Sequence, residues 1–132
     1  MKICYLDFDR TIQELSYPET DIQFINQHCI EFVKLIKNKG YKVILNTYRA
    51  DLNDGSLEQA LKFLDSKIDL DEIVKNKIPP QPFIIGNDIL FIDDESIGIP
   101  LKLSDKILGV KVVDFSKIIK LLKSKYYKNN QF

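Results

Sequence analysis

Residues 2–8 read KICYLDF, a short apolar run rich in residues that favour β-structure. An aspartate, Asp7, lies near its end. Such a run is typical of a strand that is buried on both faces of a parallel sheet. Asp9, Arg10 and Thr11 follow directly. Because residues two apart in an extended chain point the same way, we expect the carboxylates of Asp7 and Asp9 to face one site.

Helical and strand patterns alternate along the rest of the chain. From Asp21, apolar residues recur at three- and four-residue spacing up to Gly40, which predicts one helix. A strand is expected at 41–47, and a capping-box pattern at 56–59 opens the next helix. The last helix is expected to begin after an Asp114 cap. Further strands are expected near residues 72–75, 89–92 and 110–113.

This rhythm predicts an α/β fold, a three-layer α/β/α, Rossmann-like parallel sheet of about five strands. In such sheets ligands bind at the carboxyl ends of the strands. The length fits one domain over residues 1–132. Residues 123–132 lose the helical periodicity, so we expect them to fray.

Charge and composition narrow the classes of partner. The chain has 19 Lys plus Arg and 19 Asp plus Glu, so no basic excess indicates nucleic acid, although the balance leaves such a partner open. No apolar run is long enough to cross a bilayer, which argues against a membrane partner and favours a cytoplasmic location. Cys4 and Cys29 are interpreted as small core hydrophobes. Oligomerisation stays open.

Polar residues also follow two later strands. Thr47 ends the strand at 41–47, where its hydroxyl can bond a phosphoryl oxygen. The strand at 89–92 ends in three acids, residues 93–95, which repel one another and need a compensating cation. Carboxylates suit Mg²⁺, which prefers oxygen ligands and often binds substrate phosphate as well. Acids that end a strand are also common turn residues.

The order of these residues resembles that of the haloacid dehalogenase-like phosphohydrolases. That order is Asp-x-Asp-x-Thr after the first strand, Thr after the second, Lys before the fourth and Asp-Asp after it. The resemblance spans residues 2–101. FIDDESIGIP at 91–100 and the Tyr17-Pro18 segment are similar to small members that lack a cap domain. The connections on either side of Thr47 likewise leave no room for a cap.

The resemblance implies a role for each matching residue. Asp7 would be the nucleophile, and Asp9 the general acid and base. Thr47 and Lys77 would hold the phosphoryl group, with Lys75 as the alternative lysine. The resemblance also places the first and fourth strands side by side, so that all the acids meet at one edge. The expected Mg²⁺ ligands are Asp7, Asp9, Asp93 and Asp94, the last by orienting metal-bound water.

Arg10 departs from the family pattern, which usually has glycine at this position. If the backbone there needs a positive φ, arginine is disfavoured and the loop geometry must differ. Otherwise the guanidinium could clamp the phosphate or point to solvent, and we favour the solvent-pointing side chain. Tyr48 and Arg49 could contact the leaving group or pack on the next helix. The residues expected to contact substrate are therefore Arg10, Thr11, Tyr48 and Arg49.

Together with these patterns, the resemblance implies a Mg²⁺-dependent phosphohydrolase that forms an aspartyl-phosphate on Asp7. Its substrate would be a phosphorylated small molecule or macromolecule, because family members without caps have open sites that suit bulky substrates. The alternative is a regulatory module that binds Mg²⁺ and phosphate with little or no turnover, which Arg10 keeps open. A receiver domain is disfavoured, since receivers place the acidic pair after the first strand rather than last.

Overall fold

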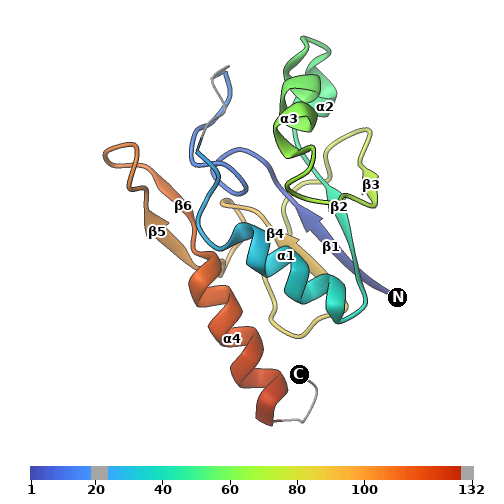
Figure 1. Ribbon diagram of the computed structural model, residues 1–132, viewed down its shortest axis with the longest axis vertical. Helices are drawn as coiled ribbons and strands as arrows, with labels where there is room; N and C mark the ends of the chain where they lie inside the picture. The colour runs from blue at the N-terminus through green and yellow to red at the C-terminus, as the bar shows by residue number, and fades with distance from the viewer. Residues whose placement is uncertain (19–23, 129–132) are drawn as a thin grey trace.

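The computed structural model describes residues 1–18 and 24–128 (Figure 1). Its main sheet has four parallel strands in the order β3-β2-β1-β4. The strands are β1 (Lys2–Leu6), β2 (Tyr41–Leu45), β3 (Glu72–Ile73) and β4 (Ile89–Ile92). In the register, Ile3 of β1 lies opposite Ile89 of β4. The expected pairing of the first and fourth strands is thus confirmed.

The strand expected near 110–113 does not join this sheet. It is β6 (Lys111–Val113), which pairs antiparallel with β5 (Leu101–Leu103) in a separate hairpin. The expectation of about five parallel strands is therefore wrong. The parallel sheet has four strands, and this strand belongs to a separate antiparallel pair. The hairpin is held instead against the loop after β1, because the Val113 N–H donates to the Arg10 carbonyl at 3.1 Å.

Helix α1 (Cys29–Asn38) carries the expected apolar stripe but begins later than predicted. Residues 24–28 are not helical, because Asn26 forms hydrogen bonds with distant parts of the chain instead. The Asn26 side chain donates to the carbonyls of Thr11, at 2.9 Å, and Val113, at 2.6 Å. The predicted start at Asp21 lies outside the described residues.

Helix α3 (Ser56–Leu64) follows the short helix α2 (Arg49–Leu52) and starts differently from the capping-box prediction. Ser56 is its first residue rather than its cap. Gly55 takes the cap position with a φ of 87°, a conformation that glycine adopts without strain. The Asp54 carboxylate then accepts a hydrogen bond from the Ser56 N–H at 3.0 Å, so Asp54 supplies the side-chain acceptor.

Helix α4 (Phe115–Lys128) begins as predicted, because the Asp114 carboxylate accepts the Lys117 N–H at 3.0 Å. The helix continues through residues 123–128, so this part of the expected frayed tail is helical instead. Residues 129–132 lie outside the described part of the chain.

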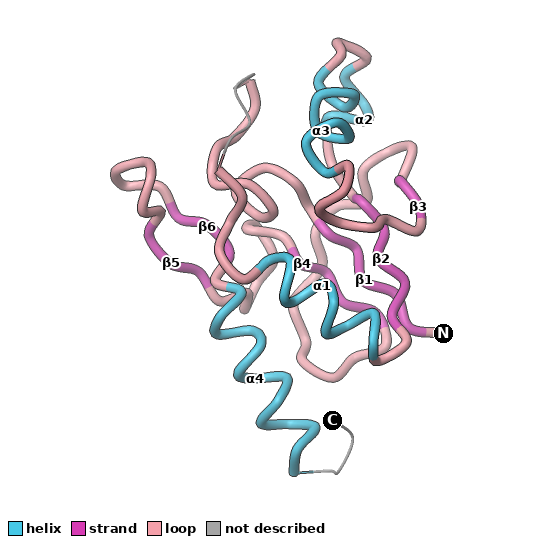
Figure 2. Tube along the Cα trace, viewed as in Figure 1, coloured by secondary structure: helices cyan, strands magenta, loops and turns pink. Residues whose placement is uncertain are grey.

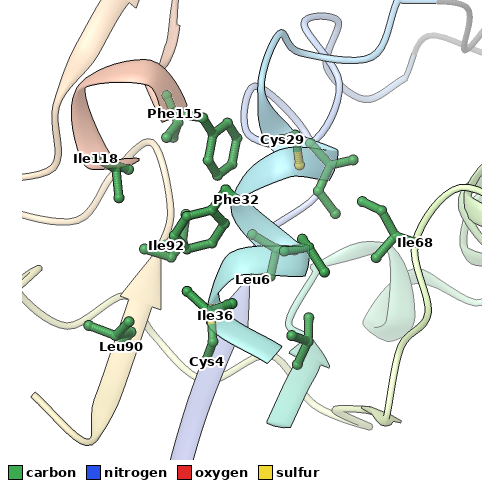
Figure 3. Packing of buried hydrophobic residues seen from close by; sticks show 14 of the residues in the cluster. Cys4, Leu6, Cys29, Phe32, Ile36, Ile68, Leu90, Ile92, Phe115 and Ile118 are labelled. Carbon is green, nitrogen blue, oxygen red and sulfur yellow. The ribbon is translucent and has the colours of Figure 1, made fainter. Parts of the chain in front are cut away.

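Helices α1 and α4 pack on one face of the sheet, as Figure 3 shows for part of the core. Apolar residues of α1, α3 and α4 share one cluster with the strand residues Cys4, Leu6, Val43, Leu45, Leu90 and Ile92. On the opposite face Tyr5 stacks on Phe91 with ring centroids 5.0 Å apart. The connection from β3 to β4, residues 74–88, contains no helix (Figure 2). Among the described residues this connection therefore supplies no helix for the expected third layer.

Candidate functional site

Two acids meet at the carboxyl ends of the neighbouring strands β1 and β4. The Asp7 N–H continues the hydrogen bonding between β1 and β4, since it donates to the Ile92 carbonyl at 2.9 Å. Asp93 directly follows Ile92, the last residue of β4. Asp7, Asp93 and Asp94 each place a carboxylate oxygen within 4.8 Å of the others. Asp7 and Asp93 are buried, so these acids are held in place by the fold rather than free on the surface.

Lys77 lies between the two buried acids. Its Nζ is 3.1 Å from Asp7 Oδ1 and 3.0 Å from Asp93 Oδ2. Lys75, the alternative lysine, is exposed. The structure therefore brings Lys77 to the expected acids.

Asn46, at the end of β2, positions the loop that carries Lys77. Its side-chain Nδ2 donates to the Ile78 carbonyl at 3.0 Å, and its Oδ1 accepts the Ile78 N–H at 2.9 Å. Asp51 adds a second anchor by accepting the Lys77 N–H at 3.2 Å. Sequence reasoning missed Asn46, although a polar amide that ends a buried strand needs partners of this kind.

The acids and the lysine shift one another's ionisation. Burial raises the pKa of Asp7 well above its usual range; Asp93 adds to this shift, and Lys77 opposes it. Burial also raises the pKa of Asp94 to about 6, against a hydrogen bond with Asp7 that lowers it. Burial alone would lower the pKa of Lys77, but Asp7 and Asp93 together raise it, so Lys77 stays charged.

This donor set fits a divalent cation. When all three acids are ionised, three carboxylates against one ammonium leave two formal negative charges. Hard cations prefer such oxygen ligands. Hydrogen bonds also orient two of the acids, from Thr11 Oγ1 to Asp7 Oδ2 at 3.0 Å and from the Glu95 N–H to Asp93 Oδ1 at 2.9 Å. Asp7, Asp93 and Asp94 could therefore hold a metal ion.

Asp9 is not one of these three clustered acids. Its carboxylate binds Arg49 through two contacts, Nη2 to Oδ1 at 2.7 Å and Nε to Oδ2 at 3.0 Å. Gln13 Nε2 donates to the same Oδ1 at 3.0 Å. The structure therefore does not bring the Asp9 side chain into the cluster with the other three expected metal ligands, because both of its oxygens accept hydrogen bonds from the buried Arg49.

Arg49 is 1% exposed and ranks among the largest fully buried side chains of the described chain. Its guanidinium carbon lies 5.0 Å from the Phe8 ring centroid and 5.9 Å from that of Tyr17. Its Nη1 donates to the Ser56 carbonyl at 3.3 Å. The arginine expected to contact substrate thus borders the cavity described below, but its charge is already paired with Asp9.

Arg10 adopts a left-handed backbone conformation, with a φ of 57°. Its N–H donates to the Leu15 carbonyl at 3.1 Å, and its own carbonyl accepts the Val113 N–H. The position therefore has the geometry that favours glycine, and arginine bears some strain there. The side chain is exposed, in agreement with the solvent-pointing interpretation, and it borders the cavity.

The two threonines are buried rather than open to substrate. Thr11 Oγ1 donates to Asp7 and accepts the Asp94 N–H at 3.3 Å, so it ties the two acidic segments together. Thr47 Oγ1 accepts the Arg49 N–H at 3.2 Å, at the start of α2. Neither side chain borders the cavity.

A cavity of about 390 Å³ opens above the acids. The Tyr48 ring lies over Lys77, with Nζ 4.4 Å from the ring centroid. Sequence reasoning missed Ser16 and Leu52 as wall residues, because neither belongs to a motif. The cavity is lined by Asp7, Asp9, Arg10, Ser16, Tyr17, Tyr48, Arg49, Leu52, Lys77, Asp94 and Glu95.

Comparison of the chain with protein-family models, with curated proteins and with solved structures found no match in any of the three. Within residues 1–18 and 24–128, no helix has both the length and the apolar character needed to cross a membrane.

Proposed function

We propose that this chain is a Mg²⁺-dependent phosphohydrolase of the haloacid dehalogenase-like class, with Asp7 as its nucleophile. The observation that carries the proposal is the placement of Lys77 between Asp7 and Asp93, at 3.1 and 3.0 Å, beside a cavity. A carboxylate next to a fixed cation at the ends of parallel strands suits attack on a phosphoryl group, whose negative charge the cation offsets.

In this proposal an Asp7 oxygen forms a bond to phosphorus as the bond to the leaving oxygen breaks in line. Thr11 and Lys77 orient the Asp7 carboxylate by holding one oxygen each. Lys77 also offsets charge on the phosphoryl oxygens. Mg²⁺ held by Asp7, Asp93 and Asp94 would supply further positive charge at those oxygens.

Asp9 is the proposed proton carrier. It gives a proton to the leaving oxygen and then takes one from the water that attacks the aspartyl-phosphate, which frees phosphate and restores Asp7. Both Asp9 oxygens accept hydrogen bonds from Arg49. One of these contacts must open before Asp9 can carry a proton, and substrate binding in the adjoining cavity is the proposed trigger.

The same Arg49–Asp9 contact supports a second candidate, a module that binds Mg²⁺ and phosphate without turnover. If the contact never opens, no group delivers the proton. The strained backbone of Arg10, next to Asp9, favours this candidate as well. Both candidates share the metal and phosphate site, so only turnover separates them.

The test is phosphate release with Mg²⁺ across sugar phosphates, nucleotides, phosphopeptides and 3′-phosphorylated oligonucleotides. The matched variants are Asp7→Asn and Asp88→Asn, since Asp88 is an exposed acid just before β4. We expect turnover of at least one class by the wild type and by Asp88→Asn, and none by Asp7→Asn. Equal turnover by all three proteins would contradict the role of Asp7, and no turnover at all would favour the binding module.

A further inference from the structure

Three exposed apolar side chains gather on the wall of the cavity. Tyr17 is 45% exposed, Tyr48 55% and Leu52 44%. Leu52 follows Tyr48 by four residues across α2, so the two lie one turn apart on the same side. Tyr17 comes from the loop after β1 and is tied to the segment after α2, because its hydroxyl donates to Asp54 at 2.7 Å.

The reaction geometry places the leaving group among these side chains. In an in-line displacement the leaving oxygen lies opposite the attacking oxygen. Asp7 is only 5% exposed and borders the cavity, so a leaving group on the far side of the phosphoryl group would face the more exposed residues of the lining. The exposed side chains of the lining would therefore contact the body of the substrate.

The cavity is larger than a phosphoryl group needs. At about 390 Å³ it falls within the roughly 300–1,000 Å³ typical of small-molecule sites. Exposed apolar side chains that converge on such a cavity favour an apolar ligand surface, and tyrosine rings favour a flat one. The polar rim residues Arg10, Ser16 and Glu95 remain for polar substituents.

We infer that the site accepts phosphate monoesters whose leaving group carries an apolar ring, and that Tyr17, Tyr48 and Leu52 contact this ring. The inference rests on the proposed function, because it takes the phosphoryl group to lie at Asp7 and Lys77. It adds a substrate class and makes Leu52 a specificity-determining residue.

Binding of two non-hydrolysable phosphonates tests this inference without any need for turnover. Dissociation constants for benzylphosphonate and methylphosphonate are measured by calorimetry with Mg²⁺ present. We expect the wild type to bind benzylphosphonate at least about tenfold more tightly, since burial of the ring adds apolar contact area. Leu52→Gln should reduce that ratio at least about threefold, because it removes apolar contact with the ring.

The control is Leu103→Gln on β5, because Leu103 is a 63% exposed leucine that does not border the cavity. It should keep the wild-type ratio, and circular dichroism should show that both variants are folded. Similar affinities of the wild type for the two phosphonates, or an unchanged ratio in Leu52→Gln, would overturn the inference and leave the proposed function standing. Failure of the wild type to bind either phosphonate with Mg²⁺ would instead contradict the proposed function, and the inference with it.

Discussion

Arg49 binds Asp9 with two parallel contacts, Nη2 to Oδ1 at 2.7 Å and Nε to Oδ2 at 3.0 Å. The planar guanidinium matches the carboxylate, which is the geometry of strong charge-assisted hydrogen bonds. Because Arg49 is 1% exposed and Asp9 is its only acidic partner among the described residues, the pair is both a structural element and part of the proposed proton path.

Removal of Asp9 should destabilise the fold. Asp9→Ala leaves the buried Arg49 charge unpaired, and we expect the free energy of unfolding to fall by about 3 kcal/mol in urea titrations. The exposed Asp88→Ala change should stay within about 0.5 kcal/mol of the wild type. Equal stability of the two variants would show that Arg49 does not depend on Asp9.

Arg10→Gly should stabilise the protein. A non-glycine residue in the left-handed region costs roughly 1–2 kcal/mol, and glycine loses part of that gain through its greater freedom when unfolded. We expect a net gain of about 0.5–1 kcal/mol, measured by urea unfolding. Arg10→Ala removes the same side chain but keeps the strained φ, so it should give no gain. A gain from both variants would attribute the effect to the side chain instead.

The same substitution tests whether the Arg10 side chain takes part in the reaction. Because it is exposed, we expect Arg10→Gly to change kcat/KM by less than about threefold. A loss of about tenfold would indicate a phosphate clamp, and a rise would indicate that arginine distorts the loop.

Asn46→Ala should damage the site from a distance. It leaves the partly buried Ile78 N–H and carbonyl without their partner and loosens the loop that carries Lys77. We expect kcat/KM to fall by at least about tenfold, because small misplacements of reacting groups are costly. Asn46→Asp keeps an acceptor for the Ile78 N–H, so its kcat/KM should lie between those of the wild type and Asn46→Ala. Full activity of Asn46→Ala would mean that Asp51 alone positions Lys77.

The acidic cluster should make stability depend on pH when metal is absent. The pKa of Asp94 is raised to about 6 in the folded protein, from about 4 when unfolded, and burial also raises the pKa of Asp7 well above its usual range. The folded state therefore holds more protons at these two acids, so their contribution to stability is full below about pH 4 and is lost as the pH rises through the raised pKa values. Unfolding in EDTA at pH 4, 5, 6 and 7 should show this loss, and Asp94→Asn should reduce it.

Millimolar Mg²⁺ should offset that loss, because a cation that binds only the folded site stabilises it. We expect the Tm at pH 7 to rise with Mg²⁺ in the wild type and to rise less in Asp93→Asn. An unchanged wild-type Tm would count against a metal at these acids.

The strand ends of the site could be predicted from sequence, and its internal pairings could not. Asp7 and Asp93 each follow an apolar run, so their position at the sheet edge follows from local pattern. The Arg49–Asp9 pair joins residues 40 positions apart, and no local spacing encodes it. A prediction from sequence does not include this pair, and it therefore places Asp9 among the metal ligands.

The same distinction holds for the fold. The apolar runs of β1, β2 and β4 are long enough to indicate strands, whereas β5 has only three residues. Its pairing with β6 depends on tertiary contacts rather than on local sequence, because Asn26 and Arg10 form hydrogen bonds with the Val113 backbone. The helix expected from Asp21 fails at residues 24–28 for the same reason, because Asn26 satisfies other backbone groups instead of continuing a helix.

The central claim, that Asp7 carries the phosphoryl group, is tested most directly by trapping it there. The protein is incubated with acetyl phosphate and Mg²⁺, quenched in acid and digested, and the peptide that contains Asp7 is analysed by mass spectrometry. We predict one added phosphoryl group on Asp7 in the wild type, and none in Asp7→Asn or in EDTA. Phosphate release by a wild-type protein whose Asp7 peptide is never phosphorylated, or the same modification in Asp7→Asn, would contradict the account.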